Sequence, residues 1–280
     1  MNSKIADYFI LTRPANLFLG VAAIFLGAWL TGSVQPISKV IFACLSGAFI
    51  MAAGNALNDY YDVDIDRVNK PFRPLAANRL NSSAALFFSI ILFVLGIFLS
   101  IFVHYRALFL ALFIVAGLTF YNARLKRTVL FGNIAVSILS GLAFVYGGLA
   151  VGRWQAALIP AVFAFLFHLG REIIKDVEDK SADETISAQT LPIRWGDRAA
   201  LAIATLIYCI LIVFTFLPYF WGIFGKGYFW IVVFGVDLVI VFVLILIWMK
   251  PVTGTMRTVS AILKADMLMG MLAIYVGNRF

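Results

Sequence analysis

The sequence predicts an all-α integral membrane protein, a bundle of nine transmembrane helices with a central polar cavity that opens near the cytoplasmic side. Hydrophobic residues make up 63% of the 280 positions and charged residues only 13%, with a mean hydropathy of +0.98. That composition is too apolar for a domain whose whole surface meets water. The apolar residues also form runs of about 20, the length that crosses about 30 Å of hydrocarbon as a helix.

The runs and the polar segments between them predict one domain over residues 1–280. The first run is as long as the later ones and follows Lys4 and Asp7, so we interpret it as a span and not as a cleavable signal. Gly222, Gly225 and Gly227 indicate a turn between the seventh and eighth spans. We expect the spans at residues 12–31, 37–58, 84–103, 106–121, 132–150, 155–175, 199–217, 228–249 and 260–277.

The basic residues predict the orientation. Most of the 22 Lys and Arg residues fall on the side of the N-terminus and of the even-numbered span ends. Such residues accumulate in cytoplasmic loops, so we expect a multi-pass protein of the cell membrane with a cytoplasmic N-terminus and the C-terminus on the opposite side. Topology and anionic membrane lipids explain the net charge of +8, and no nucleic-acid partner is expected.

Most of the acidic residues lie in two short segments with one spacing. Offsets of three and seven residues fall within roughly 60° of a helix, so each segment predicts one acidic stripe. Both segments end even-numbered spans and therefore face one cavity. Asn58 lies beside the first stripe, whereas Asp64 and Glu178 point elsewhere and are expected to be solvated. The stripes consist of Asp59, Asp62 and Asp66 in the first segment and Asp176, Asp179 and Asp183 in the second.

Ordinary surface charge is the alternative interpretation of these stripes, because loop carboxylates often only balance nearby Lys and Arg. Three stacked carboxylates repel one another, however, unless a cation compensates them. Oxygen ligands without nearby His or Cys are typical of Mg²⁺, which bridges carboxylates to phosphate oxygens. We therefore predict a Mg²⁺ site for a diphosphate, with these metal ligands: Asn58, Asp59, Asp62, Asp66, Asp176, Asp179 and Asp183.

Basic residues that could hold the remaining phosphate oxygens follow directly. Lys70 and Arg73 lie in a loop that Pro71 and Pro74 stiffen. A second basic segment follows the fourth span; its candidate substrate-binding residues are Tyr121, Arg124, Lys126 and Arg127. Tyr121 is equally well explained as an interface residue.

These segments resemble the UbiA-type intramembrane prenyltransferases. The family's N-x-x-x-D-x-x-x-D motif is similar to Asn58, Asp62 and Asp66, and its D-x-x-x-D motif is similar to Asp179 and Asp183. Further matches are Arg13-Pro14-x-Asn16, NKPFRPLA from Asn69, YNARLKRTVLFGN from Tyr121 and Thr190-Leu191-Pro192. The resemblance implies two Mg²⁺ ions that hold an allylic diphosphate, with Arg13 and Asn16 at the substrate. It also implies these catalytic residues: Asp62, Asp66, Asp179 and Asp183.

Within the family, the segment GREIIKDVED from Gly170 most resembles the branch that makes archaeal-type ether lipids. That resemblance implies transfer of a polyprenyl group, geranylgeranyl, from its diphosphate to the hydroxyl of geranylgeranylglyceryl phosphate, a lipid-phosphate acceptor. Candidates for binding the acceptor's phosphate are Arg73, Arg124, Lys126 and Arg127. An aromatic or quinone-precursor acceptor, such as 4-hydroxybenzoate or dihydroxynaphthoate, is the first alternative. A cation transporter is the second, although its carboxylates would lie near the membrane midplane.

Three other polar residues need an interpretation. His104 is expected at the membrane interface. His168 lies two turns before Asp176 and either lines the cavity or is hydrogen-bonded within the bundle. Asp237, midway along the eighth span, is far from both stripes, so we predict a helix-to-helix hydrogen bond there.

Overall fold

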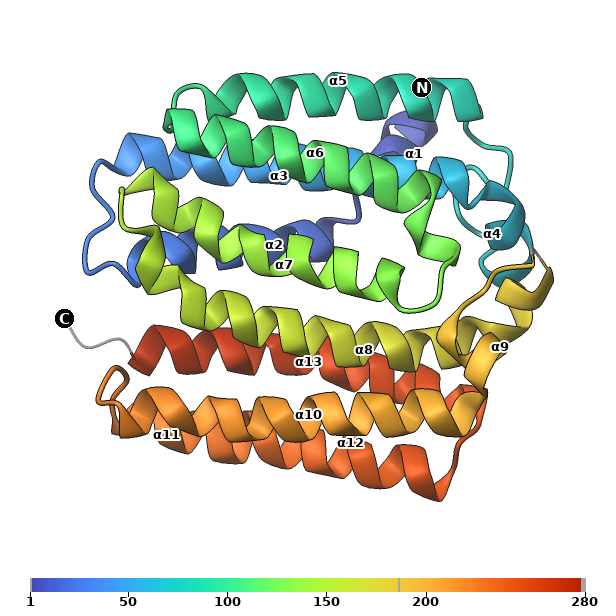
Figure 1. Ribbon diagram of the computed structural model, residues 1–280. Coiled ribbons are helices and arrows are strands. Elements are labelled where there is room, and N and C mark those ends of the chain that lie inside the picture. Colours follow the sequence, from blue (N-terminus) through green and yellow to red (C-terminus); the bar gives the residue numbers. More distant parts are fainter. Residues whose placement is uncertain (1, 186, 278–280) are drawn as a thin grey trace.

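The computed structural model describes residues 2–185 and 187–277, and every regular element in those ranges is a helix. The long helices run side by side in one bundle (Figure 1). The elements in chain order are α1 (Asn2–Thr12), α2 (Pro14–Trp29), α3 (Ile37–Tyr61), α4 (Val63–Asn69), α5 (Ser82–Ser100), α6 (Tyr105–Ala123), η1 (Leu125–Arg127), α7 (Phe131–Ala150), η2 (Trp154–Ala157), α8 (Leu158–Thr185), α9 (Leu191–Trp195), α10 (Asp197–Phe220), α11 (Lys226–Ile231), η3 (Val232–Asp237), α12 (Leu238–Met249) and α13 (Thr253–Gly277).

The bundle is that of a multi-pass membrane protein. Eight helical segments of the described chain are long and apolar enough to cross a membrane, and α1 with α2 would make a ninth. Large apolar side chains cover the outside of the bundle, among them Phe87, Phe113, Val213 and Phe234. Such a surface suits contact with lipid tails. The C-terminal residues 278–280, which we expected on the side opposite the N-terminus, lie outside the described residues.

The first predicted span corresponds to α2, and a second helix, α1, precedes it at an angle. The helix breaks at Arg13, which has a left-handed backbone conformation (φ 53°), and α1 and α2 meet at a bend of 43°. Pro14 occupies the first position of α2, where its missing N–H costs nothing, and it disfavours a helical conformation for the residue before it. The predicted span over residues 12–31 therefore agrees with α2 to within two residues at each end, whereas the separate helix α1 before the break was not predicted.

Most of the other spans were placed close to their observed bounds, although α13 begins at Thr253, seven residues before the predicted start. The second and sixth run further than predicted, to Tyr61 in α3 and to Thr185 in α8, so both acidic segments lie on or next to helix. The predicted turn before the eighth span is confirmed, with Gly222 at φ +71°. The eighth span itself contains one stretch of π-helix, η3, between α11 and α12.

Helices α2 and α7 approach each other closely. A Cβ atom on Gly147 would lie 1.7 Å from the carbonyl oxygen of Ile24, and a Cβ on Gly27 would lie 1.9 Å from that of Phe144. The two backbones therefore touch without intervening side chains. Small residues commonly allow this in membrane helices, where dispersion contacts stabilise the bundle.

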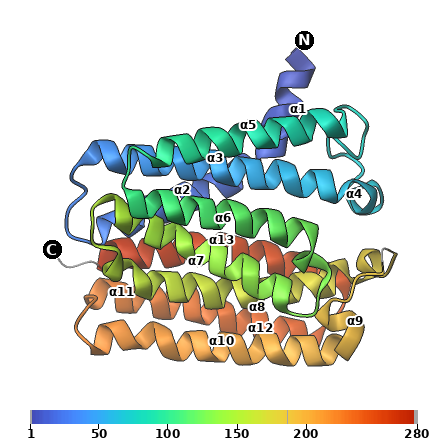
Figure 2. The same ribbon diagram turned by 45° about the horizontal axis from the view of Figure 1, so that its top comes forward.

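Both acidic segments lie at the same end of the bundle. The short helices α4 and α9, which follow the long helices α3 and α8, are together at that end in both views (Figures 1 and 2). Contacts between α4 and α8 join the two segments directly. The prediction that both acidic segments lie at one end of the bundle is confirmed. The prediction that they face one cavity is not confirmed, because none of their six stripe carboxylates lines the cavity inside the bundle.

Candidate functional site

The first acidic cluster is buried and its carboxylates are paired with basic side chains. Asp59, Asp62 and Asp66 are 3%, 8% and 3% exposed, although they lie near the end of the bundle. The Arg73 guanidinium lies 3.0 Å from Asp59 and 2.5 Å from Asp66. Lys126 forms an ion pair with Asp62. Burial of such carboxylates is tolerable only because positive charge accompanies it.

Arg13 ties the start of α2 to this cluster. Because its backbone leaves the helical path there, its guanidinium reaches α3, where it pairs with Asp59 and donates a 2.8 Å hydrogen bond to the Asn58 side chain. The Asn58 amide in turn donates to the Asn122 side chain at 3.0 Å. The side chains of three helices are thereby fixed relative to one another.

The second cluster lies on one face of α8. Lys175 donates to Asp179 at 3.1 Å, one helical turn further along. Asp176 accepts a 2.8 Å hydrogen bond from the Asn133 amide at the start of α7. Asp183 is half-buried and lies within the electrostatic reach of Asp62 in the first cluster.

Lys70 connects the two clusters electrostatically. It follows α4 directly. The carboxylates of Asp66 and Asp179, one from each cluster, stabilise its positive charge. Burial and the neighbouring Lys175 nevertheless lower the pKa of Lys70. Burial likewise raises the pKa of Asp66, against the opposing effect of Arg73. Both shifts follow from burial of these two side chains.

The donor set of the two clusters fits Mg²⁺ with a phosphate ligand. The side chains offer carboxylate oxygens, which this cation prefers. Among the described residues no three His, Cys, Asp or Glu side chains converge on one point. A cation held by one or two carboxylates from each side and by phosphate oxygens needs no such convergence, which is how Mg²⁺ is commonly bound.

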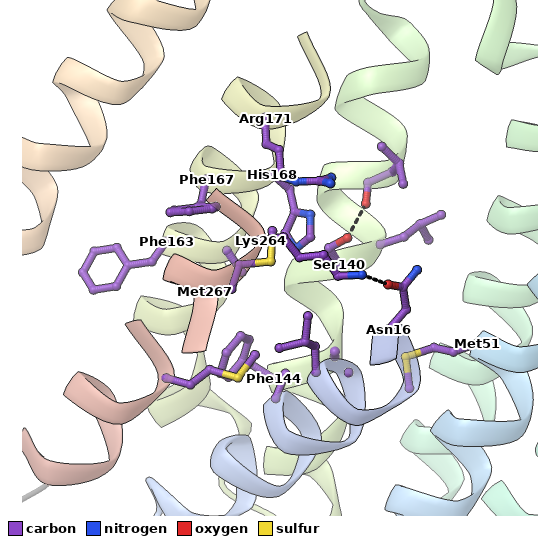
Figure 3. A pocket seen from close by; sticks show the side chains of 18 of the residues that line it. Asn16, Met51, Ser140, Phe144, Phe163, Phe167, His168, Arg171, Lys264 and Met267 are labelled. Carbon is purple, nitrogen blue, oxygen red and sulfur yellow. Dashed lines mark hydrogen bonds between the residues drawn. The ribbon is translucent and has the colours of Figure 1, made fainter. Parts of the chain in front are cut away.

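A cavity of about 480 Å³ lies inside the bundle, and Figure 3 shows some of the side chains that line it. Its lining includes Arg13, Lys126 and Lys175, which pair with Asp59, Asp62 and Asp179 of the clusters. Along α8 it extends from Lys175 to Pro160, a distance of about 22 Å at 1.5 Å per residue. The end next to the clusters is lined by polar and charged side chains. The far end is apolar and includes Ile24, Phe144 and Phe163. One cavity thus offers a charged end and a long apolar end.

Five of the predicted site residues line this cavity, and the others take different places. Arg124 and Arg127 are exposed and do not line it, because they flank and end the short helix η1 at the end of the bundle. The cavity-lining five are Arg13, Asn16, Asn58, Tyr121 and Lys126. The other predicted residues, all in the two clusters and their loop, do not line it: Asp59, Asp62, Asp66, Lys70, Arg73, Asp176, Asp179 and Asp183.

Asp64 is solvated as expected, with its side chain 80% exposed. Glu178 is not: its side chain is 16% exposed and lies 3.5 Å from Arg257 of α13, so that prediction was wrong. Helix α13 covers the face of α8 that we took to be open to water.

The predicted helix-to-helix hydrogen bond of Asp237 is confirmed, with the Thr215 hydroxyl of α10 3.1 Å from the Asp237 carboxyl group.

Several polar residues of the cavity were missed at the sequence level, although His168 had been considered and does line it. Arg171, Glu172 and Lys175 belong to α8, and Lys264 and Asp266 to α13. Asp266 is 3% exposed, and its carboxyl oxygens have no hydrogen-bond partner in the described part of the chain. The sequence could have identified them as candidate site residues, because they lie inside predicted membrane spans, where ionisable residues are commonly functional.

Comparison with known proteins bears on this site. Residues 20–262 match the UbiA prenyltransferase family. A relative from Sulfurisphaera tokodaii, named digeranylgeranylglyceryl phosphate synthase, is 38% identical over 224 residues, which are 78% of this chain and 80% of the relative.

Solved structures of similar proteins agree with this family match. A structure described as digeranylgeranylglyceryl phosphate synthase in membranes superposes with a TM-score of 0.79 at 31% identity and covers 98% of each chain. A UbiA homologue from Archaeoglobus fulgidus, bound to DMAPP and Mg²⁺, has the same fold, with a TM-score of 0.71 at 18% identity over 96% of this chain and 99% of the homologue. The acidic clusters, the helical bundle and these matches together show that the chain belongs to the UbiA prenyltransferase family.

Proposed function

We propose that the chain transfers a geranylgeranyl group from an allylic diphosphate to the hydroxyl of geranylgeranylglyceryl phosphate, forming an ether-lipid precursor. One observation carries the proposal: two carboxylate clusters with Lys and Arg partners lie at the charged end of a cavity that is apolar further in. A prenyl diphosphate has the same division into a charged head and an apolar tail. Relatives named digeranylgeranylglyceryl phosphate synthase support this choice of acceptor.

Asp62, Asp66, Asp179 and Asp183 would hold Mg²⁺, with Asn58, Asp59 and Asp176 as neighbouring oxygen ligands. A homologue from Archaeoglobus fulgidus that was solved with DMAPP and Mg²⁺ supports a need for this cation. When bound, Mg²⁺ would neutralise charge on the departing pyrophosphate. Lys70, Arg73 and Lys126 lie beside these carboxylates and would bind the remaining phosphate oxygens.

The reaction breaks the allylic C–O bond, whose electron pair leaves with the pyrophosphate. The glycerol hydroxyl oxygen then bonds to the prenyl carbon and loses its proton to the released pyrophosphate. Apolar residues such as Phe144 and Phe163 surround the inner cavity and would exclude water, which would otherwise convert the prenyl cation to an alcohol.

We further propose that residues 1–280 form one domain with nine spans, in which α1 and α2 together make the first. The N-terminus and the charged end of the cavity would face the cytoplasm, and the C-terminus would lie on the opposite side of the cell membrane. The Lys and Arg residues around α4, η1 and α9 support this orientation.

Product identity tests the proposal. Purified protein in lipid nanodiscs is given geranylgeranyl diphosphate with geranylgeranylglyceryl phosphate, and in parallel with 4-hydroxybenzoate or 1,4-dihydroxy-2-naphthoate. Mass spectrometry is expected to find the diether phosphate and an equal amount of pyrophosphate. A prenylated aromatic product alone would replace the proposed acceptor, and ion flux without release of pyrophosphate would contradict transferase activity.

Removal of divalent cations gives a second prediction. EDTA is expected to stop turnover, and added Mg²⁺ to restore it, because carboxylate oxygens supply the predicted metal ligands. The melting temperature without substrate is expected to change little, since Arg73 and Lys126 already compensate Asp66 and Asp62. Turnover that continues at full rate in EDTA would contradict the metal assignment.

A further inference from the structure

A second group of basic side chains lies in the cavity, and of its members Arg13 also pairs with the first acidic cluster. Arg171 of α8 and Lys264 of α13 point into the cavity beside Asn16 of α2 and His168 (Figure 3). The Lys264 ammonium donates a 2.6 Å hydrogen bond to the Asn16 side-chain oxygen. The positive charges of Arg171 and Arg13 both repel the ammonium group of Lys264. Three cations therefore share one wall of the cavity.

The charge balance of this group is incomplete. Arg13 is paired with Asp59, and Arg171 with Glu172 at 2.9 Å. Lys264 makes no ion pair within the described part of the chain. An ammonium group at this depth is costly without a counter-ion, so the group favours an anionic ligand.

The free donors of the group converge on the cavity. The Arg171 guanidinium is held by Glu172 and by the Ser260 hydroxyl at 3.3 Å, so its position is fixed. It still has N–H groups to donate, as does the ammonium of Lys264, which uses one of its three hydrogens on Asn16. A phosphate monoester accepts several such bonds at once.

We infer that Arg171, Lys264 and Asn16 form the subsite for the phosphate of the lipid-phosphate acceptor. The inference rests on the proposed function. Arg171 lies five residues before Asp176 and eight before Asp179, about 8 Å and 12 Å along α8, so this group lies beside the proposed diphosphate site and not within it. The acceptor's hydroxyl must come within about 3.5 Å of the prenyl carbon, which places its phosphate beside the diphosphate and not in the same place.

The basic residues that we first expected to bind this phosphate are less suitable. Arg73 and Lys126 already compensate Asp66 and Asp62. Arg124 and Arg127 are exposed and lie outside the cavity. Arg171 and Lys264 line the cavity, and among the residues that the structure describes Lys264 has no carboxylate partner to give up.

Kinetics of the Lys264→Met variant test the inference. The KM for geranylgeranylglyceryl phosphate is expected to rise about 10- to 100-fold, as for loss of a charge-assisted hydrogen bond. The KM for geranylgeranyl diphosphate is expected to stay within about twofold. Lys264→Arg should restore much of the acceptor affinity, whereas Lys250→Met, which removes an exposed lysine at the end of α12, should change neither constant.

Two further experiments distinguish failure of the phosphate subsite from failure of the proposed function. With dephosphorylated geranylgeranylglycerol as acceptor, wild-type protein and Lys264→Met should be equally slow, because no phosphate is left to bind. In wild-type protein, glycerol 1-phosphate should compete with the acceptor and not with geranylgeranyl diphosphate, a test that needs no variant to fold. An unchanged acceptor KM in Lys264→Met, or competition only with the diphosphate, would overturn the subsite. If wild-type protein makes no ether product at all, the proposed function itself fails.

Discussion

Asp62→Ala and Asp179→Ala are each expected to lower prenyl transfer at least about 1000-fold, equivalent to about 4 kcal/mol of transition-state stabilisation. Each variant removes a carboxylate from one of the two facing clusters, which together would hold the metal ions and the diphosphate. The loss should appear in kcat, because charge on the leaving group grows only as the bond breaks.

Both variants should remain folded. The partner ammonium groups, Lys126 for Asp62 and Lys175 for Asp179, are 28% and 35% exposed and can be hydrated when the carboxylate is lost. Pyrophosphate release gives the rate, and size-exclusion chromatography in detergent gives the folded fraction. The matched control is Asp64→Ala, in the same segment but 80% exposed, which should keep wild-type turnover. Near-normal turnover in Asp62→Ala or Asp179→Ala would remove that residue from the site.

Gly147→Ala is expected to destabilise the bundle by at least about 3 kcal/mol and to reduce the yield of monodisperse protein. The added Cβ would lie 1.7 Å from the Ile24 carbonyl oxygen, which is backbone and cannot rotate away. Relief requires α2 and α7 to separate, which opens voids along their whole contact.

Thermal unfolding in detergent measures the effect. Gly254→Ala is the matched control, because Gly254 is also helical but its Cβ would meet nothing within 4 Å. That variant should unfold within about 0.5 kcal/mol of wild type, or slightly later, since alanine is the better helix former. Equal melting temperatures for the two variants would mean that the α2–α7 contact is looser than the structure indicates.

The spans and the acidic clusters could be predicted because their signals are local. An apolar run has the length of a span whatever it packs against, and the three- and seven-residue offsets of Asp176, Asp179 and Asp183 depend only on helix geometry. The break at Arg13 also had a local signal in Pro14, but the hydropathy of the whole run concealed it.

The charged cavity wall could not be predicted in the same way. Asn16 and Lys264 are 248 positions apart, and only the packing of α13 against α2 brings them together. In the basic segment after the fourth span, the residues are neighbours in the sequence but take different places in the structure. Arg124, Lys126 and Arg127 look equivalent in sequence, yet the direction of one short helix turns Lys126 towards Asp62 and leaves the two arginines exposed.

The break at Arg13 couples the N-terminal helix to the charge of the site. A positive φ is unfavourable for arginine, and the ion pair with Asp59 helps to offset that cost. The same residue thus sets both the angle between α1 and α2 and the neutralisation of one carboxylate. If a ligand displaced Arg13 from Asp59, α1 would still be held by the ion pair between Asp7 and Arg79 and by the hydrogen bond from the Asn55 side chain to the Thr12 carbonyl oxygen, so the charge of the site could change without release of this helix.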